Sequence, residues 1–401
     1  MTVVVQKYGG SSVADVGRIR KVADRVAAAK ASGKDVVVVV SAMGDTTDEL
    51  LALARQVSES PARRELDMLL SAGERISMAL LSMALNARHV PAVSFTGSQS
   101  GIITNDAHTN ARIVEVRPYR VEDELARGKV VIVAGYQGVS YKREVTTLGR
   151  GGSDTTAVAL AAALGAEACE IYSDVDGVYS ADPRVVPEAR RLAEISYEEM
   201  QELAEAGARV LNAQAVEFAK EKGIAIYTRA TTGGEGETVV RRFPPRAPGR
   251  VVGVASEAGL VQLGLEAADP RALSRLLELL DRRGTGGKQL LYERARGRAS
   301  LVLARENLHD FPALERELRQ SFGERLRLDE GVGAVSAIGA GINASFVNVG
   351  EALASLAGIP VLGLSTSSFR ISMLVAEDQL HEAVRRLHER LVLGAPGRTA
   401  D

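Results

Sequence analysis

Five consecutive valines, at positions 36–40, set the first constraint on the fold of this 401-residue chain. A run without polar residues on either side of the pleat is typical of a strand that is covered on both faces. Similar short apolar runs alternate with stretches whose apolar residues recur every three to four positions, the period of a helix. This alternation predicts an α/β domain with a mostly parallel sheet and helices on both of its faces.

The predicted elements of this first domain occupy residues 1–240. We expect buried strands at residues 2–6, 36–40, 91–95, 130–134, 168–172 and 224–228. Helices are expected at 65–85 and 154–164, and residues 197–222 are long enough for two helices. The next segment, residues 241–250, reads RRFPPRAPGR and has no apolar period, which predicts a linker between domains.

Beyond the linker, the order of predicted elements changes. Residues 251–330 follow the order strand, helix, strand, strand, helix, and residues 331–401 repeat it. This order predicts two ferredoxin-like (βαββαβ) units in tandem. Such units are common ligand-binding and pairing modules, so the repeat alone does not define a function.

Composition and charge exclude several classes of protein. The net charge of −2 gives no reason to expect nucleic acid or an acidic membrane as a partner. The only cysteine, Cys169, cannot form an internal disulfide, which is consistent with a reducing cytoplasm. The first apolar run is too short for a signal peptide, and we expect no stretch near the roughly 18 apolar residues of a membrane helix. These features predict a cytoplasmic protein.

The first candidate site follows the first predicted strand and comprises Lys7, Tyr8, Gly9, Gly10 and Ser11. Paired glycines let backbone N–H groups approach phosphate oxygens, and the helix behind them favours negative charge at its N-terminus. The lysine adds a positive charge beside the phosphate. A plain tight turn would need only the glycines, so the lysine is what favours a phosphate-binding loop.

Two further loops offer groups for a small ligand. Ser41 and Thr47 follow the valine strand, where they either bind a ligand through their hydroxyls or belong to a simple strand-to-helix loop. Glu74 lies inside an apolar helical stretch, where a carboxylate needs a partner. That partner is either the ammonium group of a substrate or an arginine of the chain, such as Arg75.

The strongest physical signal is a loop that precedes an alanine-rich helix and comprises Arg150, Gly151, Gly152, Ser153 and Asp154. The arginine fork can hold a carboxylate or a phosphate, and the glycines bring the backbone close to a ligand. Asp154 alone would serve as a helix cap, but a cap does not require the Arg-Gly-Gly sequence before it. The loop therefore predicts an anion-binding site.

A fifth segment follows the strand that contains Cys169, and its residues suit a nucleotide. It offers carboxylates, an aromatic face and an arginine in Ser173, Asp174, Tyr179, Asp182 and Arg184. The chain has no Gly-x-x-x-x-Gly-Lys-Ser/Thr sequence, so it is not a P-loop enzyme. No cluster has the spacing of zinc ligands, and we expect no metal site made by the protein itself.

Several segments together resemble the monofunctional bacterial aspartokinases. These segments are KYGGSS, VVVVVSAMGDTTDEL, LLSAGERIS, SFTGSQSGIIT, TTLGRGGSDTTAVALAAAL and EIYSDVDGVYSADPRVVP. The resemblance covers nearly all of residues 1–235. It implies an amino-acid-kinase-like three-layer αβα sandwich that transfers the γ-phosphate of ATP to the side-chain carboxylate of L-aspartate. The product would be 4-phospho-L-aspartate, on the route to lysine, threonine and methionine.

The resemblance also implies a role for each candidate residue. The catalytic residues would be Lys7 and Asp154. The substrate would be bound by Ser41, Thr47, Glu74, Arg150, Gly151, Gly152 and Ser153, with Glu74 on the α-ammonium and Arg150 on a carboxylate. The nucleotide would be bound by Lys7, Tyr8, Gly9, Gly10, Ser11, Ser173, Asp174, Tyr179, Asp182, Arg184 and Arg209. ATP would bring Mg²⁺, held mainly by the phosphates.

Two positions depart from the family pattern. Arg209 stands where the family usually has lysine, and Gln214 stands where it usually has a basic residue. Arginine keeps the charge but not the shape of lysine, so we expect a changed affinity for the nucleotide.

The two C-terminal units resemble the ACT domains with which aspartokinases sense lysine or threonine. The His-Pro-Gly or Lys-Pro-Gly pattern of the ligand loop is missing, and residues 343–347 read NASFV instead. Side chains would occupy space that glycine leaves open, and we expect Phe346 to fill the pocket. The units should still fold and pair, which would give a homodimer or a larger assembly.

Two other hypotheses remain open at this point. One is that the chain is a kinase of the same fold for another acidic substrate. The other is that it is a non-catalytic regulatory paralogue. The first alternative would give Glu74 and Arg150 different groups to hold. The presence of Lys7, Arg150 and Asp154 argues against the second.

Overall fold

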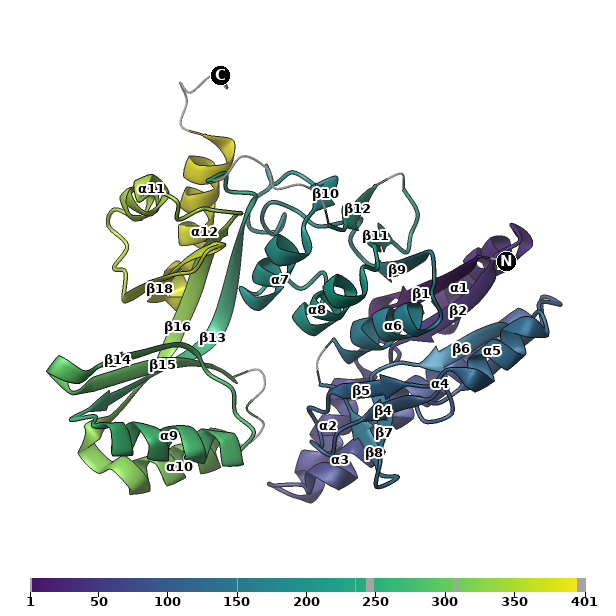
Figure 1. The fold of residues 1–401 in the computed structure, drawn as a ribbon, viewed down its shortest axis with the longest axis horizontal. Coiled ribbons are helices and arrows are strands. Elements are labelled where there is room, and N and C mark those ends of the chain that lie inside the picture. The colour runs from purple at the N-terminus through teal and green to yellow at the C-terminus, as the bar shows by residue number, and fades with distance from the viewer. Residues whose placement is uncertain are drawn as a thin grey trace. The chain divides into compact units, whose positions relative to one another are not determined.

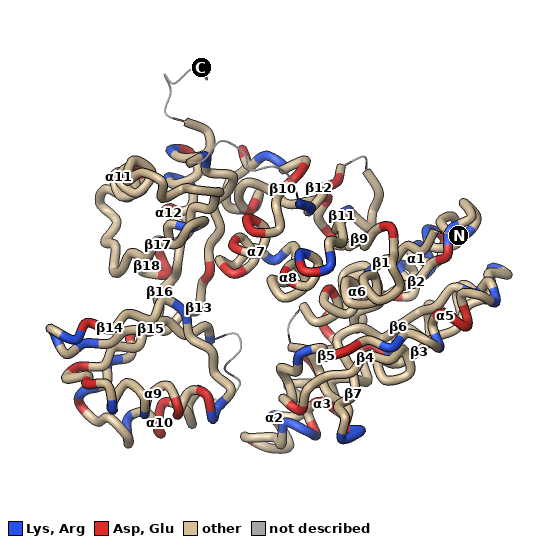
Figure 2. The backbone as a smooth tube through the Cα atoms, viewed as in Figure 1, with Lys and Arg blue, Asp and Glu red and all other residues tan. Residues whose placement is uncertain are grey.

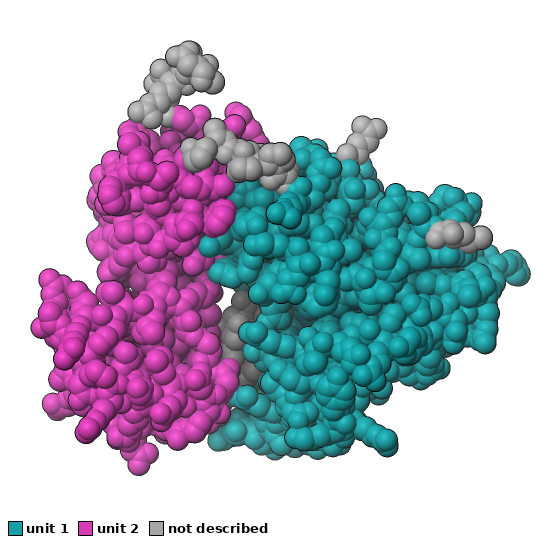
Figure 3. Space-filling model, in the orientation of Figure 1, with its two compact units in different colours: residues 1–179, 191–205, 209–244 teal, residues 180–190, 206–208, 245–401 magenta. Residues whose placement is uncertain are grey.

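The structure is a computed structural model that describes residues 2–149, 151–234, 236–242, 249–305, 308 and 311–394. The chain divides into two compact units, drawn in different colours in Figure 3. The first unit contains residues 1–179, 191–205 and 209–244, and the second contains 180–190, 206–208 and 245–401. Two short segments from the middle of the chain therefore belong to the second unit.

An eight-stranded sheet forms the centre of the first unit, in the order β10-β12-β11-β9-β1-β2-β6-β3 (Figure 1). All neighbouring strands are parallel except β11 and β12. The strands are β1 (Val3–Tyr8), β2 (Asp35–Val40), β3 (Ala92–Phe95), β6 (Val130–Ala134), β9 (Ala168–Ser173), β10 (Glu194–Ile195), β11 (Ile226–Ala230) and β12 (Glu237–Val240). The predicted mostly parallel sheet is confirmed.

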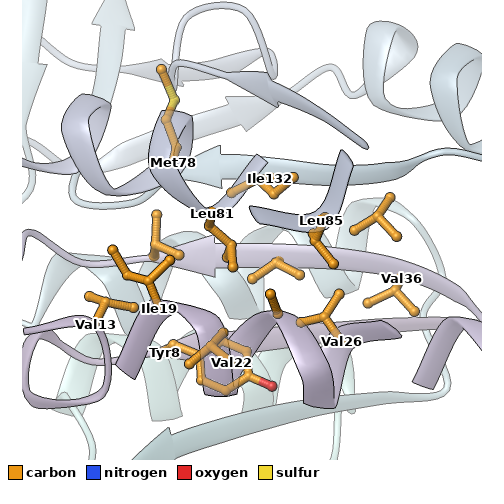
Figure 4. Packing of buried hydrophobic residues seen from close by; sticks show 14 of the residues in the cluster. Tyr8, Val13, Ile19, Val22, Val26, Val36, Met78, Leu81, Leu85 and Ile132 are labelled. Atoms are coloured by element: carbon orange, nitrogen blue, oxygen red, sulfur yellow. The ribbon is translucent and has the colours of Figure 1, made fainter. Parts of the chain in front are cut away.

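One face of this sheet is covered by α1 and α4. Met78, Leu81 and Leu85 of α4 lie in one buried cluster with apolar residues of α1 and of the central strands (Figure 4). The helices of the first unit are α1 (Val16–Ala31), α2 (Thr46–Val57), α3 (Arg63–Leu70), α4 (Ala72–Asn86), α5 (Tyr119–Ala126), α6 (Gly152–Ala163), α7 (Tyr197–Glu205) and α8 (Ala213–Lys222). The single helix expected at 65–85 is two helices, which meet at Ser71.

The other face of the sheet is covered by α6, and α8 packs beside α6. All residues of α6 from Gly152 to Ala161 are buried, because its alanines let neighbouring elements approach on every side. Side chains alternate along β1, so Tyr8 packs into the cluster of α1 and α4, whereas Lys7 points to α6. The predicted three-layer αβα sandwich is confirmed.

Length and composition would allow residues 63–86, which form α3 and α4, to cross a membrane. This finding contradicts the expectation that no stretch comes near that length. It is weak evidence for a membrane, because a core helix of a globular domain passes the same test, and α4 contributes Leu81 and Leu85 to the core. Figure 2 shows basic and acidic residues interspersed over both units.

A second, smaller sheet of the first unit was not predicted. It has the order β5-β4-β7-β8, with β4 (Ile102–Thr104), β5 (Ile113–Val116), β7 (Gln137–Ser140) and β8 (Val145–Thr147). Strands of three or four residues are too short to show a period of two in the sequence. This sheet matters for the site because β8 leads directly into the Gly149–Ser153 loop.

The second unit contains a six-stranded antiparallel sheet in the order β14-β15-β13-β16-β18-β17. The strands are β13 (Gly253–Glu266), β14 (Lys288–Glu293), β15 (Arg298–Ala304), β16 (Leu326–Ile338), β17 (Gly363–Thr366) and β18 (Arg370–Ala376). The helices are α9 (Pro270–Arg282), α10 (Phe311–Phe322), α11 (Val347–Ser355) and α12 (Leu380–His388).

Two of the buried clusters in this unit correspond to two ferredoxin-like halves. Leu263 and Leu301 lie in one core with residues of α9 and α10. Val254, Val335 and Ile371 lie in the other with residues of α11 and α12. The ferredoxin-like architecture is confirmed, but β13 and β16 each run through both halves. The proposed boundaries at 240/241, 250/251 and 330/331 stay predictions, and residues 243–248 of the expected linker lie outside the described residues.

Candidate active site

Three of the segments predicted to bind ligands follow neighbouring strands of the large sheet, namely β1, β2 and β9. The strands β9, β1, β2 and β6 are adjacent and parallel, so their carboxyl ends lie at one edge. Such an edge is where parallel α/β sheets bind their ligands. The segments that follow these strands start at Gly9, Ser41, Gly135 and Asp174.

Lys7 and Asp154 form an ion pair at this edge. Lys7 Nζ lies 2.7 Å from Asp154 Oδ1, and the two side chains are only 12% and 8% exposed. The backbone N–H of Asn212 donates to Asp154 Oδ2 at 3.3 Å. Because a buried charge without a partner is costly, this pair holds the start of α6 against the end of β1.

The glycine loop after β1 is held by its neighbours. Gly44 N donates to Gly10 O at 3.1 Å, and Gly9 N donates to Tyr172 O at 3.1 Å. A Cβ atom at Gly10 would lie 3.0 Å from the carbonyl oxygens of Ala42 and Gly44, so the close approach favours glycine. The loop is therefore closely packed against the segment that follows β2.

Serine residues and the tyrosine of this first loop differ in their exposure. Ser11 is exposed, whereas the hydroxyl of Ser12 lies 2.6 Å from Thr231 Oγ1. Tyr8 is fully buried, and its ring stacks on Tyr172 with centroids 4.8 Å apart. Its side chain is part of the core, so only the backbone of Tyr8 is available to a nucleotide.

Glu74 is a buried carboxylate with one oxygen that lacks a partner. It lies in the first turn of α4 and is 2% exposed. Its Oε1 accepts a hydrogen bond from Ala42 N at 3.2 Å, but Oε2 has no partner among the described residues. Arg75 instead donates to Gln137 Oε1 at 3.4 Å. Burial raises the pKa of Glu74 from its ordinary value of 4.5 to about 7.

The loop between β8 and α6 brings the backbone close to this edge of the sheet. Gly151 is the N-cap of α6 with φ 71°, and a Cβ atom there would lie 2.6 Å from Asn212 Cβ. Gly152 N donates to Gly149 O at 3.0 Å. Ser153 is buried against Gly135, at the end of β6. Arg150 lies outside the described residues, so its role stays a prediction.

The remaining substrate candidates lie close to the valine strand. Ser41 directly follows β2, is half-buried, and donates through its backbone N–H to Tyr8 O at 3.1 Å. Thr47 lies half-buried in the first turn of α2. Both positions are consistent with the prediction that these residues line the substrate site, but their contacts with a ligand stay predictions.

Three nucleotide candidates lie in or near the turn after β9. Ser173 Oγ donates to Val175 O at 3.2 Å, and Asp174 is exposed. Tyr179 donates its hydroxyl to Asp176 Oδ1 at 2.8 Å, and this hydrogen bond raises the pKa of Tyr179. Arg209 is exposed in the segment between α7 and α8. Their contacts with a nucleotide stay predictions.

Asp182 and Arg184 lie in the second unit, whereas Ser173, Asp174 and Tyr179 belong to the first. Their side chains pair with each other, with Arg184 Nη2 2.7 Å from Asp182 Oδ2 and Nε 3.0 Å from Oδ1. This pairing lowers the pKa of Asp182. The structure therefore does not gather the five predicted residues into one compact unit, and the role of these two stays a prediction.

Sequence reasoning did not identify Asn212 as part of this region. Its side chain caps α8 by accepting hydrogen bonds from Gln214 N and Ala215 N. An asparagine before a helix predicts such a cap. Its contact with Asp154 could not be read from the sequence, because 58 residues separate the two.

The raised pKa of Glu74 predicts how its substitution changes stability with pH. The folded protein binds this proton more tightly than the unfolded chain, so stability falls as pH rises from about 4.5 to 7. We expect Glu74→Gln to be more stable relative to wild type at pH 8 than at pH 5, by up to about 3 kcal/mol. Thermal unfolding of both proteins at both pH values measures this difference.

Glu199→Gln is a matched control for this experiment. Glu199 is also 2% exposed, but its carboxylate accepts hydrogen bonds from Ser196 N and Oγ. We expect this control to lose stability at both pH values, because it weakens existing hydrogen bonds. A stability difference for Glu74→Gln that is the same at pH 5 and pH 8 would contradict the prediction.

Comparisons with known proteins match this chain over nearly its full length. The model of the amino acid kinase family matches residues 2–229. An aspartokinase from Mycolicibacterium smegmatis is 46% identical over 416 residues, which cover 98% of this chain and 97% of that protein. The structure of E. coli aspartokinase III in complex with aspartate and ADP (R-state) matches at a TM-score of 0.85 and 26% identity, over 97% of this chain and 99% of that chain.

The same enzyme has also been solved in a second state. E. coli aspartokinase III in complex with lysine and aspartate (T-state) matches at a TM-score of 0.73 and 26% identity, again over 97% of this chain and 99% of that chain. The 46% identity to the Mycolicibacterium smegmatis aspartokinase over nearly the full length, together with the family match and the shared fold, shows the family. The chain belongs to the aspartokinases, within the amino acid kinase family.

Proposed function

We propose that this chain transfers the γ-phosphate of ATP to the side-chain carboxylate of L-aspartate and releases 4-phospho-L-aspartate. The observation that carries the proposal is Glu74 Oε2, a buried acceptor without a partner among the described residues. A desolvated carboxylate of this kind binds a cation, and the α-ammonium of an amino acid is one. The complex of E. coli aspartokinase III with aspartate and ADP supports aspartate and an adenine nucleotide as the ligands.

The substrate would lie between Glu74 and the loop before α6. Glu74 would hold the α-ammonium, and Arg150 would hold a carboxylate through its fork. Ser41, Thr47 and Ser153 would line the same side, and the N–H groups of the Gly151–Gly152 segment would face the anion. Two opposite charges on either side of an amino acid fix its orientation for the reaction.

The chemistry requires positioning and charge neutralisation rather than a general base. A carboxylate with a pKa of about 4 is already ionised at neutral pH. Two anions must meet, so positive charge at the transferring phosphoryl group lowers the barrier. Lys7 would supply that charge, Asp154 would hold its ammonium group in place, and Mg²⁺ would arrive on the phosphates of ATP.

The nucleotide would use the segments after β1 and β9. Gly9, Gly10 and Ser11 would surround the phosphates, together with the backbone of Tyr8. Ser173, Asp174, Tyr179 and Arg209 of the first unit would also contact the nucleotide, whereas the predicted roles of Asp182 and Arg184 are not part of this proposal. We place this chemistry in the cytoplasm.

The proposal includes an assembly through the second unit, as a homodimer or larger. The sheet of this unit ends in the edge strands β14 and β17. Leu290 and Leu291 of β14 are 50% and 55% exposed, and Leu364 of β17 is 42% exposed. Exposed leucines on an unpaired edge are typical of strands that meet another chain.

A hydroxamate assay tests the reaction. Purified enzyme is incubated with ATP, Mg²⁺ and hydroxylamine, and aspartate is compared with glutamate and acetylglutamate. We expect aspartyl hydroxamate to form fastest. Preference for another acid would favour a same-fold kinase for that substrate, and no product with any acid would favour a regulatory paralogue.

Lys7→Ala should abolish measurable turnover, with a loss of at least about a hundredfold, because the ammonium group acts mainly on the transition state. It also leaves Asp154 buried without its partner, so some loss of stability is expected. The double variant Lys7→Ala with Asp154→Asn should regain stability but not turnover. Comparing kcat with the unfolding temperature separates the two effects, and near-normal turnover of Lys7→Ala would remove Lys7 from the mechanism.

The KM for aspartate should rise as pH falls below about 7. Protonation of Glu74 in the free enzyme removes the charge that binds the ammonium group, at a cost of up to about tenfold per pH unit. Glu74→Gln should flatten this profile and raise the KM for aspartate by roughly tenfold to a hundredfold, with little change for ATP. Arg150→Ala should likewise raise the KM for aspartate far more than the KM for ATP. An unchanged KM in Glu74→Gln would remove Glu74 from the substrate site.

We predict that lysine and threonine, alone or together, inhibit this enzyme weakly or not at all. Ala344, Ser345 and Phe346 carry side chains at the turn where a Pro-Gly pair would leave space for a ligand. Phe346 itself is 86% exposed, which contradicts the expectation that it fills the pocket.

Activity in millimolar lysine, threonine and their mixture measures this insensitivity. The reason is that feedback needs a ligand that prefers one state, and this turn lacks the Pro-Gly pair that would let the backbone pass close to a ligand. Calorimetry with each amino acid is the independent check. Strong inhibition, or clear heat of binding by either amino acid, would show that the altered loop still forms a site.

A further inference from the structure

Asp67 has no role in the mechanism above, yet it is a fully buried carboxylate beside the site. It lies on α3 and is 0% exposed. Its Oδ2 lies 2.6 Å from His108 Nδ1, and its Oδ1 accepts from Thr109 N at 3.0 Å and from Thr147 Oγ1 at 2.5 Å. One side chain therefore connects α3 with two segments that are distant in the sequence.

The first of these segments is under backbone strain. Thr109 has φ 68°, in the left-handed region that a β-branched residue rarely adopts. Strain of this kind persists only where the surroundings enforce it, and it is common at functional sites. The hydrogen bond from Thr109 N to Asp67 is one such constraint. A Cβ atom at Gly149 would lie 3.1 Å from Asn110 Oδ1 and 3.5 Å from Thr109 O, so this strained turn packs against the loop before α6.

The second segment is β8, which leads into the same loop. Thr147 is fully buried at the end of β8 and precedes Gly149 by two residues. Its carbonyl accepts from Ala111 N at 2.9 Å, so β8 and the segment around Thr109 are also joined to each other. Asp67 therefore bonds both to the segment that packs against Gly149 and to the strand that leads into the same loop.

On its other side, Asp67 belongs to the helix pair that carries Glu74. The α3 helix ends at Leu70, and Ser71 joins it directly to α4. Gln137 Nε2 donates to Ser71 O at 2.9 Å, so this junction is held in place as well. In Figure 1, α3 lies beside the small sheet that contains β8.

We propose that Asp67 is a positioning residue that sets the distance between Glu74 and the loop before α6, and thereby the affinity for aspartate. The inference rests on the proposed function, since these two elements are the proposed ends of the aspartate site. Asp67 itself need not touch the substrate. A role as general base is not required, because the reacting carboxylate is already ionised.

Thr147→Val tests the link while leaving Asp67 in place. It removes the hydroxyl that donates to Asp67 and keeps nearly the same side-chain volume. Thr104→Val is the matched control, because Thr104 Oγ1 lies 2.6 Å from Thr146 Oγ1 in the same small sheet and neither residue bonds to Asp67. Thr147→Ser is the conservative variant, since it keeps the hydroxyl.

We expect Thr147→Val to raise the KM for aspartate about five- to tenfold, because small displacements of binding groups reduce productive binding sharply. The KM for ATP should change less than about twofold by the same reasoning. Thr147→Ser should restore the wild-type KM, and Thr104→Val should lower the unfolding temperature similarly without the change in KM. Equal effects of the two valine variants on both substrates would overturn the inference.

A double-mutant cycle with Asp67→Asn tests whether Thr147 acts through Asp67. If it does, adding Thr147→Val to Asp67→Asn raises the KM for aspartate little further, whereas additive effects would contradict the inference. If Asp67→Asn does not fold, the three threonine variants decide alone. Failure of wild-type enzyme to form aspartyl hydroxamate would contradict the proposed function instead. Wild-type activity with no difference between the two valine variants would contradict only the role of Asp67.

Discussion

The ion pair between Lys7 and Asp154 is the interaction on which the rest of the site depends. Lys7 belongs to β1, which lies between β2 and β9 in the large sheet, and Asp154 belongs to the first turn of α6. Because both charges are nearly buried, neither side chain can leave without a large cost in free energy. The pair thus holds the end of the sheet, the loop before α6 and, through Asn212, the start of α8 in one arrangement.

At the other end of the proposed substrate site, no ion pair within the described part of the chain neutralises the buried charge. Lys7 and Asp154 neutralise each other, whereas the carboxylate of Glu74 is buried with one oxygen unpaired among the described residues. Such a group destabilises the empty protein and is stabilised when a cation arrives. The fold therefore gives up some stability at Glu74 in exchange for affinity, which is a common trade-off at functional sites.

The sequence was most informative where chemistry and period are local. The valine strand, the alanine-rich α6 and the glycine loops were predicted because neighbouring residues determine them. The break at Ser71 was missed, because the apolar period continues across it. The Asp67 cluster was missed for a different reason. Its partners lie 41, 42 and 80 residues away, and no local pattern marks such distant pairs. Likewise, the alternation of side chains along β1 places Tyr8 in the core although its neighbour Lys7 reaches the site.

The second unit also depends on a segment from the middle of the chain. Ala181 and Val186 come from the middle of the chain, yet they are buried in the same core as Val254 and Ile371. Ser180, from the same segment, lies 2.9 Å from Nε2 of the buried His388. A shorter protein translated from an internal start near residue 245 would lack all three residues. It would have a hollow in its core and would leave the imidazole without this hydrogen bond, so residues 180–190 contribute to the stability of the second unit.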